Sequence, residues 1–138
     1  MIEGVIKKKI ISHNDRRGFF REVMKNDNKL TKIKFFQISH SKIKKSIKKG
    51  WHVHKRQSQW NYLIKGNIRV YLLDLRKKSK TFMKKMSFSV NEKNPIIYFF
   101  PPNVAHGYIT LKKDNHMMYG TSGKYSKKEE YKLPFKYE

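Results

Sequence analysis

The chain has 138 residues, 38% of them hydrophobic, with 33 Lys and Arg against 10 Asp and Glu, a net charge of +23 and no cysteine. This length fits one domain, residues 1–138, with a single core. The lack of cysteine excludes disulfides and thiolate metal sites and suits a cytoplasmic protein. No apolar run of about 18 residues predicts a membrane span.

The positive charge has two interpretations. It could attract nucleic acid or an anionic membrane. However, 27 Lys outnumber 6 Arg, and Arg is the residue that suits base edges and forked phosphate contacts. The lysines are scattered as pairs and triplets over expected turns and solvated strand faces. We therefore expect no nucleic-acid or membrane partner, although the charge favours anionic small molecules such as diphosphates.

In chain order, short alternating or β-branched segments predict strands at 4–11, 18–24, 32–41, 59–64, 68–75, 84–90, 95–100 and 106–111. Gly66 and Asn67 predict a tight hairpin between the fourth and fifth of these. No stretch of 12 residues has a helical period, and the polar tail 126–138 is expected to pack over the surface. Eight to ten strands in all predict an all-β sandwich or small jelly-roll barrel.

Residues 50–66 read GWHVHKRQSQWNYLIKG. On a strand, residues two apart share a face, so His52 and His54 point the same way and Val53 points away. A metal site, a proton-transfer site and structural packing are all compatible with two such imidazoles. A second short motif, PPNVAH, contains Asn103 and ends at His106.

The patterns His-x-His-x4-Gln-x6-Gly and Pro-x-Asn-x2-His resemble the two motifs of the cupin superfamily. This resemblance implies a cupin-type double-stranded β-helix, or jelly roll, in which His52, His54, Gln59 and His106 converge. Metal-binding cupins have Glu where Gln59 stands, and a neutral amide is a poorer ligand for a divalent ion. We therefore expect no resident metal or cofactor, with a metal site formed by these four residues as the alternative.

A narrower resemblance extends over residues 14–125. The segments NDRRGFFREV, FFQISHS, KKGWHVH, DLRKKSKTF, PPNVAHGY and MMYGTSGKY are similar, in this order, to segments of the dTDP-4-dehydrorhamnose 3,5-epimerase family. The residues that fit the family motifs are Asp15, Arg17, Gly18, Phe20, Glu22, Gln37, Lys49, His52, Tyr119 and Tyr125. Membership implies a nucleotide-diphosphate sugar as substrate and a role in surface polysaccharide synthesis.

The resemblance implies that His52 is a catalytic base and that Tyr119 is the acid on the other face of a 4-keto-6-deoxy sugar. An imidazole titrates near neutral pH, and a phenol can donate a proton. Lys49, or a protonated His54 or His106, could stabilise the enolate. Substrate-binding roles are implied for Arg17, Phe20, Glu22, Gln37, Lys49, His54, Gln59, His106 and Tyr125. A homodimer is also implied, in which the Arg17 region of one subunit completes the pocket of the other.

This chain departs from the family pattern at two points, and each leaves an alternative open for the site or the reaction. The family pairs its catalytic His with a C-terminal Asp that has no match here, so we expect His54 or a backbone carbonyl to orient His52. The spacing Gly-x-His-x-His-Lys at 50–55 resembles the sister 3,4-ketoisomerases, which move the keto group of the sugar.

Structural interpretations also remain. Tyr119 and Tyr125 could be ordinary strand aromatics, and Arg17 and Glu22 could form a cross-strand ion pair. The remaining histidines lack a supporting motif and are expected at the surface or at sheet edges: His13, His40 and His116.

Overall fold

The computed structural model describes residues 1–26 and 31–136, and these ranges contain strands but no helix. The strands are β1 (Ile6–Lys9), β2 (His13–Asp15), β3 (Gly18–Phe20), β4 (Gln37–Lys44), β5 (Lys48–His54), β6 (Gln59–Lys65), β7 (Asn67–Asp74), β8 (Lys85–Asn91), β9 (Ile96–Phe100), β10 (Val104–Thr110), β11 (Asp114–Thr121) and β12 (Glu130–Lys132). A helix able to cross a membrane is accordingly not found in the part of the chain that the structure describes.

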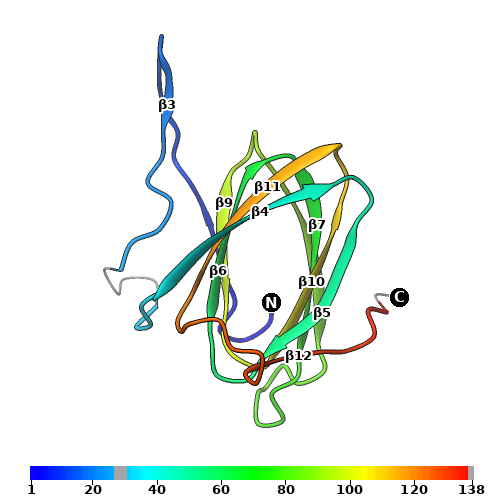
Figure 1. The fold of residues 1–138 in the computed structure, drawn as a ribbon. Coiled ribbons are helices and arrows are strands. Elements are labelled where there is room, and N and C mark those ends of the chain that lie inside the picture. Colours follow the sequence, from blue (N-terminus) through cyan, green and yellow to red (C-terminus); the bar gives the residue numbers. More distant parts are fainter. Residues whose placement is uncertain (27–30, 137–138) are drawn as a thin grey trace.

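Two five-stranded antiparallel sheets face each other (Figure 1). Their strand orders are β1-β9-β6-β11-β4 and β12-β5-β10-β7-β8, and β2 and β3 form a separate hairpin. Except for β7 and β8, neighbours in each sheet are not consecutive in the chain, as expected for a jelly roll. The predicted all-β, cupin-type jelly-roll fold is therefore confirmed.

Alternation along the strands builds the core between the sheets. In β7, Ile68, Val70 and Leu72 point inward and are at most 1% exposed. Residues two apart share a face of a strand, so one strand delivers three side chains to the core. Burial of each aliphatic side chain stabilises the fold by about 1.5–3 kcal/mol.

The outer face of the first sheet has an apolar cluster of its own. Trp60 and Tyr62 of β6 pack there with Phe99 of β9, and Met24 and Phe35 lie against them. This cluster explains why β6 is buried on both faces rather than alternating. The chain on either side of residues 27–30 therefore covers one face of the barrel.

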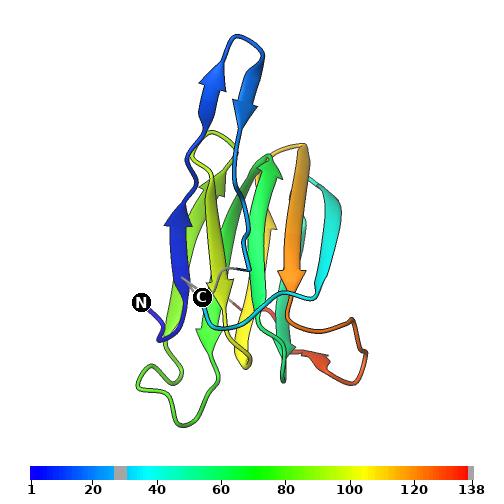
Figure 2. The same cartoon turned by 90° about the vertical axis from the view of Figure 1, so that its left-hand side faces the viewer.

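Several predicted strand bounds change. The segment predicted at 18–24 is a strand only to Phe20, because Arg21 leaves the hairpin and donates to Tyr62 Oη at 3.0 Å. The segment predicted at 32–41 begins at Gln37 and continues to Lys44, paired along its length with β11. Figure 2 shows the β2–β3 hairpin projecting beyond the barrel.

The hairpin predicted at Gly66 is wrong. β6 pairs with β9 and β11, whereas β7 pairs with β8 and β10, so Gly66 is a corner where the chain passes between sheets. Gly66 has φ +109°, and a Cβ there would lie 2.8 Å from Asn115 Cγ and 2.9 Å from Asp114 O. Asn115 is fully buried and accepts the Asn67 N–H at 3.0 Å, so it cannot move aside.

Gly66→Ala should therefore lower the free energy of unfolding by about 2–4 kcal/mol, because backbone strain and overpacking add. Gly18→Ala is the matched control, since Gly18 has φ +135° but nothing within 4 Å of its ideal Cβ. Gly18→Ala should lower the free energy of unfolding by the backbone strain alone, about 1–2 kcal/mol. Urea unfolding followed by fluorescence measures both, and equal losses would contradict the steric explanation.

Candidate active site

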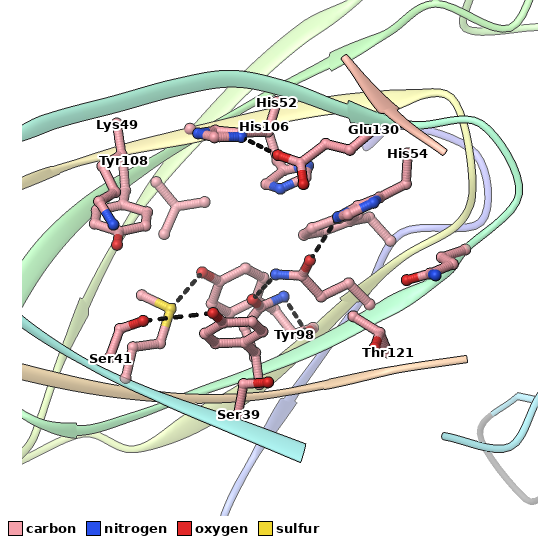
Figure 3. Close-up of a pocket in the computed structure, with 18 of the residues that line it drawn as sticks. Ser39, Ser41, Lys49, His52, His54, Tyr98, His106, Tyr108, Thr121 and Glu130 are labelled. Carbon is pink, nitrogen blue, oxygen red and sulfur yellow. Dashed lines mark hydrogen bonds and ion pairs between the residues drawn. The ribbon is translucent and has the colours of Figure 1, made fainter. Parts of the chain in front are cut away.

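A cavity of about 240 Å³ lies between the two sheets. One wall comes from β5 and β10, with His52, His54 and His106. The other comes from β4, β6 and β11, and Figure 3 shows Ser39 and Ser41 opposite His52 and Lys49. The predicted site residues in this cavity are Gln37, Lys49, His52, His54, Gln59, His106, Tyr119 and Tyr125.

His52 is oriented by Glu130 of the C-terminal tail. β12 pairs with β5, with Glu130 opposite His54 and Lys132 opposite His52. This pairing lets the Glu130 carboxylate accept a hydrogen bond from His52 Nδ1. The predicted orienting partner, His54 or a backbone carbonyl, is therefore wrong, and the tail is part of the site rather than surface packing. With Nδ1 donating, Nε2 of a neutral His52 carries a lone pair.

His54 has a carboxylate partner as well. Its Nδ1 lies 2.8 Å from Glu129 Oε2, and its Nε2 lies 3.1 Å from Gln59 Oε1. Glu129 Oε1 accepts the backbone N–H groups of Arg56 and Gln57, each at 2.8 Å. Burial alone would raise the pKa of Glu129, but these two hydrogen bonds and the one from His54 lower it on balance. Glu129 is therefore ionised at neutral pH.

His106 is the third histidine of the cavity and comes from β10. Its ring stacks on Phe100 at a centroid distance of 4.4 Å and lies 5.3 Å from the His54 ring and 5.9 Å from the His52 ring. Burial, and then the neighbouring His54 and His52, lower its pKa well below the usual value. This geometry does not favour the alternative in which a protonated His106 stabilises an enolate, because burial against Phe100 disfavours the charged form of the ring.

Tyr119 lies on the wall opposite His52. It comes from β11, and its hydroxyl lies 3.4 Å from Ser41 Oγ. Gln37 and Ser41 share the inward face of β4, and Gln37 Oε1 accepts the Tyr125 N–H at 3.0 Å. Tyr125 is 68% exposed, at the rim. An imidazole and a phenol thus face one space from opposite sheets.

Comparisons with known proteins identify the family of this chain. The family model described as dTDP-4-dehydrorhamnose 3,5-epimerase matches residues 1–137. The chain belongs to the dTDP-4-dehydrorhamnose 3,5-epimerase family. A relative in Bacillus subtilis (strain 168), the spore coat polysaccharide biosynthesis protein SpsL, is 39% identical over 111 residues, which cover 80% of this chain and 73% of SpsL.

Solved structures share the fold. The dTDP-4-dehydrorhamnose 3,5-epimerase of Sulfolobus tokodaii has a TM-score of 0.87 and 32% identity, covering 95% of this chain and 77% of that one. ChmJ, a 3'-monoepimerase from Streptomyces bikiniensis solved with dTDP-quinovose, has a TM-score of 0.90 at 17% identity, covering 96% and 70%. At that identity, the ChmJ likeness concerns the fold alone.

Three predicted members of the family site lie outside this cavity. Arg17 pairs with Asp15 at 2.6 Å, and Glu22 pairs with Lys25 at 2.9 Å. The alternative of an Arg17–Glu22 ion pair is therefore wrong. Phe20 is 64% exposed on the projecting β2–β3 hairpin. Phe20 ends β3, Arg17 lies in the turn before that strand, and Glu22 lies in the chain after it. All three are outside the cavity between the sheets, so within one chain they do not line the space beside His52.

Another family segment, DLRKKSKTF at 74–82, has a structural role. Asp74 is fully buried and accepts hydrogen bonds from Arg76, Ser79 and Thr81. Burial opposes ionisation, but these donors lower the pKa of Asp74 on balance. The segment fixes the loop after β7 and does not line the cavity.

The cavity histidines do not form a metal-ligand set. In residues 1–26 and 31–136, no three His, Asp or Glu side chains are arranged to hold an ion. Carboxylates already occupy Nδ1 of His52 and His54, and Gln59 occupies Nε2 of His54. The alternative metal site therefore receives no support from this geometry.

Sequence reasoning did not find Glu129, Glu130, Ser41 and Asn61, which complete the cavity or its hydrogen bonds. A signal for the glutamates was available. They are the only carboxylates between Asp114 and the final residue, so they were the only nearby replacements for the missing Asp.

Stability should fall at mildly acidic pH because of His106. In the unfolded chain this imidazole takes up a proton near pH 6.5. In the folded chain its pKa is lower, so the ring binds a proton only at more acidic pH. As pH falls below 6.5, the free energy of unfolding should lose about 1.4 kcal/mol per pH unit from this residue. Urea titrations between about pH 6.5 and 5 should show this slope, and His106→Gln should lack it. Equal slopes in both proteins would exclude this origin.

Proposed function

We propose that this protein is an epimerase of a nucleotide-linked 4-keto-6-deoxyhexose, with dTDP as the nucleotide, in surface polysaccharide synthesis. Family membership and the polysaccharide role in the name of SpsL support the substrate class. The observation that carries the proposal is the pair of proton-transfer groups on opposite walls of one cavity: His52, held by Glu130, and Tyr119.

The chemistry follows from that arrangement. The sugar ketone acidifies the protons on the neighbouring carbons, and Nε2 of His52 removes one of them. An enolate results, with its charge on the ketone oxygen. Tyr119 then donates a proton to the carbon from the opposite face, which inverts the configuration. Glu130 keeps the base in the reactive tautomer and stabilises the imidazolium that forms.

The cavity is large enough for only part of the proposed substrate. A volume of about 240 Å³ is below the 300–1,000 Å³ of typical pockets for drug-sized ligands. It suits a single sugar ring, so the diphosphate and the base would lie outside it, at the rim beside the exposed Tyr125. The net charge of +23 favours this anionic group.

We further propose a cytoplasmic, single-domain protein that acts as a homodimer. The projecting β2–β3 hairpin carries Arg17 and Phe20 away from their own barrel, with Phe19 and Phe20 59% and 64% exposed. In a dimer, the hairpin of one subunit would reach the rim of the other. Arg17 would then bind the diphosphate, Phe20 would stack on the base, and Glu22 would accept its ring N–H.

Incubation with dTDP-4-keto-6-deoxyglucose in deuterated water tests the function. Deuterium should enter the sugar at C3 or C5 with inversion, as read by NMR and mass spectrometry. Migration of the keto group to C3 would indicate the 3,4-ketoisomerase alternative instead. The absence of exchange with every 4-keto nucleotide sugar would contradict both reactions.

Two variants should separate the proton-transfer steps. His52→Asn should abolish deuterium uptake and lower kcat by about 10³-fold or more, because the base is lost. Tyr119→Phe should still exchange the proton that His52 removes, since the base can return it to the same face, but inversion should fall by about 10²-fold or more. Tyr119→Phe with normal inversion would exclude the phenol as the acid.

Subunit complementation tests the shared site. Arg17→Ala and His52→Asn should each be nearly inactive alone. Mixed after unfolding and refolding, they should recover about a quarter of wild-type activity, because half of the dimers are mixed and each has one intact pocket. Light scattering should give the mass of a dimer. A dimer without recovery would mean that Arg17 acts in its own subunit or not at all.

A further inference from the structure

A chain of hydrogen bonds leads from His54 to the backbone of β9. His54 Nε2 lies 3.1 Å from Gln59 Oε1, and Gln59 Nε2 lies 2.6 Å from Asn61 Oδ1. Asn61 Nδ2 in turn donates to the Tyr98 carbonyl at 3.4 Å. At the other side of the ring, Nδ1 lies 2.8 Å from Glu129 Oε2. Both ends of the chain, a carbonyl and a carboxylate, are acceptors.

The Tyr98 end fixes the orientation of both amides. A backbone carbonyl only accepts, so Asn61 must offer Nδ2 to it, which turns Oδ1 toward Gln59. Gln59 must then offer Nε2 to that oxygen, which turns Oε1 toward His54. Reversing both amides would place Asn61 Oδ1 against the Tyr98 carbonyl, two acceptors at a side chain that is 1% exposed. His54 Nε2 therefore has to donate.

The Glu129 end fixes the other ring nitrogen. Glu129 Oε1 accepts two backbone N–H groups, from Arg56 and Gln57, which holds the group as a carboxylate. Its Oε2 is then an acceptor for His54 Nδ1, which also has to donate. An imidazole that donates from both nitrogens carries two protons and a positive charge.

We propose that Glu129 and Gln59 hold His54 as an imidazolium, and that this fixed cation stabilises the enolate formed in the cavity. The second half of this inference rests on the proposed function. Figure 3 shows His54 on the same wall of the cavity as His52, with His106 and Glu130 between them. Its side chain is 12% exposed, so its charge acts in surroundings where water screens little.

The arrangement gives the two neighbouring histidines different tasks. His52 donates from Nδ1 to Glu130, and no described side chain occupies its Nε2, so it can accept a proton. His54 has no lone pair left to act as a base. Other groups that face the His54 ring are the neutral His106 of β10 and the amide of Gln59. Glu129 is the carboxylate hydrogen-bonded to the ring, and Glu130, which is paired opposite His54 in β12, is bonded to His52 instead.

Nitrogen NMR on ¹⁵N-histidine-labelled protein tests the charge state. At about pH 7.5 both ring nitrogens of His54 should carry a proton, whereas His52 should carry one, on Nδ1. His54→Gln assigns the signals, and His40→Gln, on the outer face of β4, is the matched control that should leave the His54 pattern unchanged. One unprotonated nitrogen on His54 would overturn the proposal.

Glu129→Gln tests whether the Glu129 carboxylate is the reason that His54 carries two protons. The backbone N–H groups of Arg56 and Gln57 would hold the amide oxygen, which would turn the amide NH₂ toward His54 Nδ1. His54 should then carry a single proton, on Nε2. Two protons on His54 in this variant would overturn the role assigned to Glu129.

Kinetics tests the role in the reaction. Glu129→Gln and His54→Gln should each lower kcat by about 10- to 100-fold, with KM changed less than about threefold, because the enolate loses a stabilising charge. Wild-type kcat in both variants would overturn the stabilising role. If the wild-type protein acts on no 4-keto nucleotide sugar, the proposed function fails, while the NMR result still decides the charge of His54.

Discussion

The hydrogen bonds between two glutamates of the C-terminal tail and two histidines of β5 organise the site. Consecutive residues on a strand face opposite sides, yet Glu129 and Glu130 reach His54 and His52, which share a face. Glu129 can do so because it lies in the turn just before β12. One short strand pairing therefore orients both imidazoles, and everything proposed for proton transfer depends on it.

The two pairs resemble each other but differ at the second ring nitrogen. His52 Nε2 has no hydrogen-bond partner among the described side chains, whereas His54 Nε2 meets Gln59, whose orientation is fixed by Asn61. A base and a fixed cation thus arise from the same residue type. Within the cavity, hydrogen bonds and burial set the charge of each imidazole. The net charge of +23 of the whole chain acts on anionic groups outside the cavity.

The barrel holds this site rigidly from both sides. The wall with Tyr119 is paired along eight residues with β4 and is backed by the Trp60–Phe99 cluster on the outer face. The wall with His52 and His106 continues into the core through Phe100. Proton transfer on both faces of one ring requires such fixed separation, because small displacements of reacting groups cost large factors in rate.

Three features follow from the order of residues alone: the all-β class, the shared face of His52 and His54, and the order of family motifs that includes Tyr119. These depend on residue type and on spacing along one strand. Three other features became visible in the folded chain: Gly66 is a corner between sheets, the Arg17 hairpin leaves its own barrel, and Glu129 and Glu130 close the site. Those features depend on which distant strands pair, and local alternation does not encode that choice.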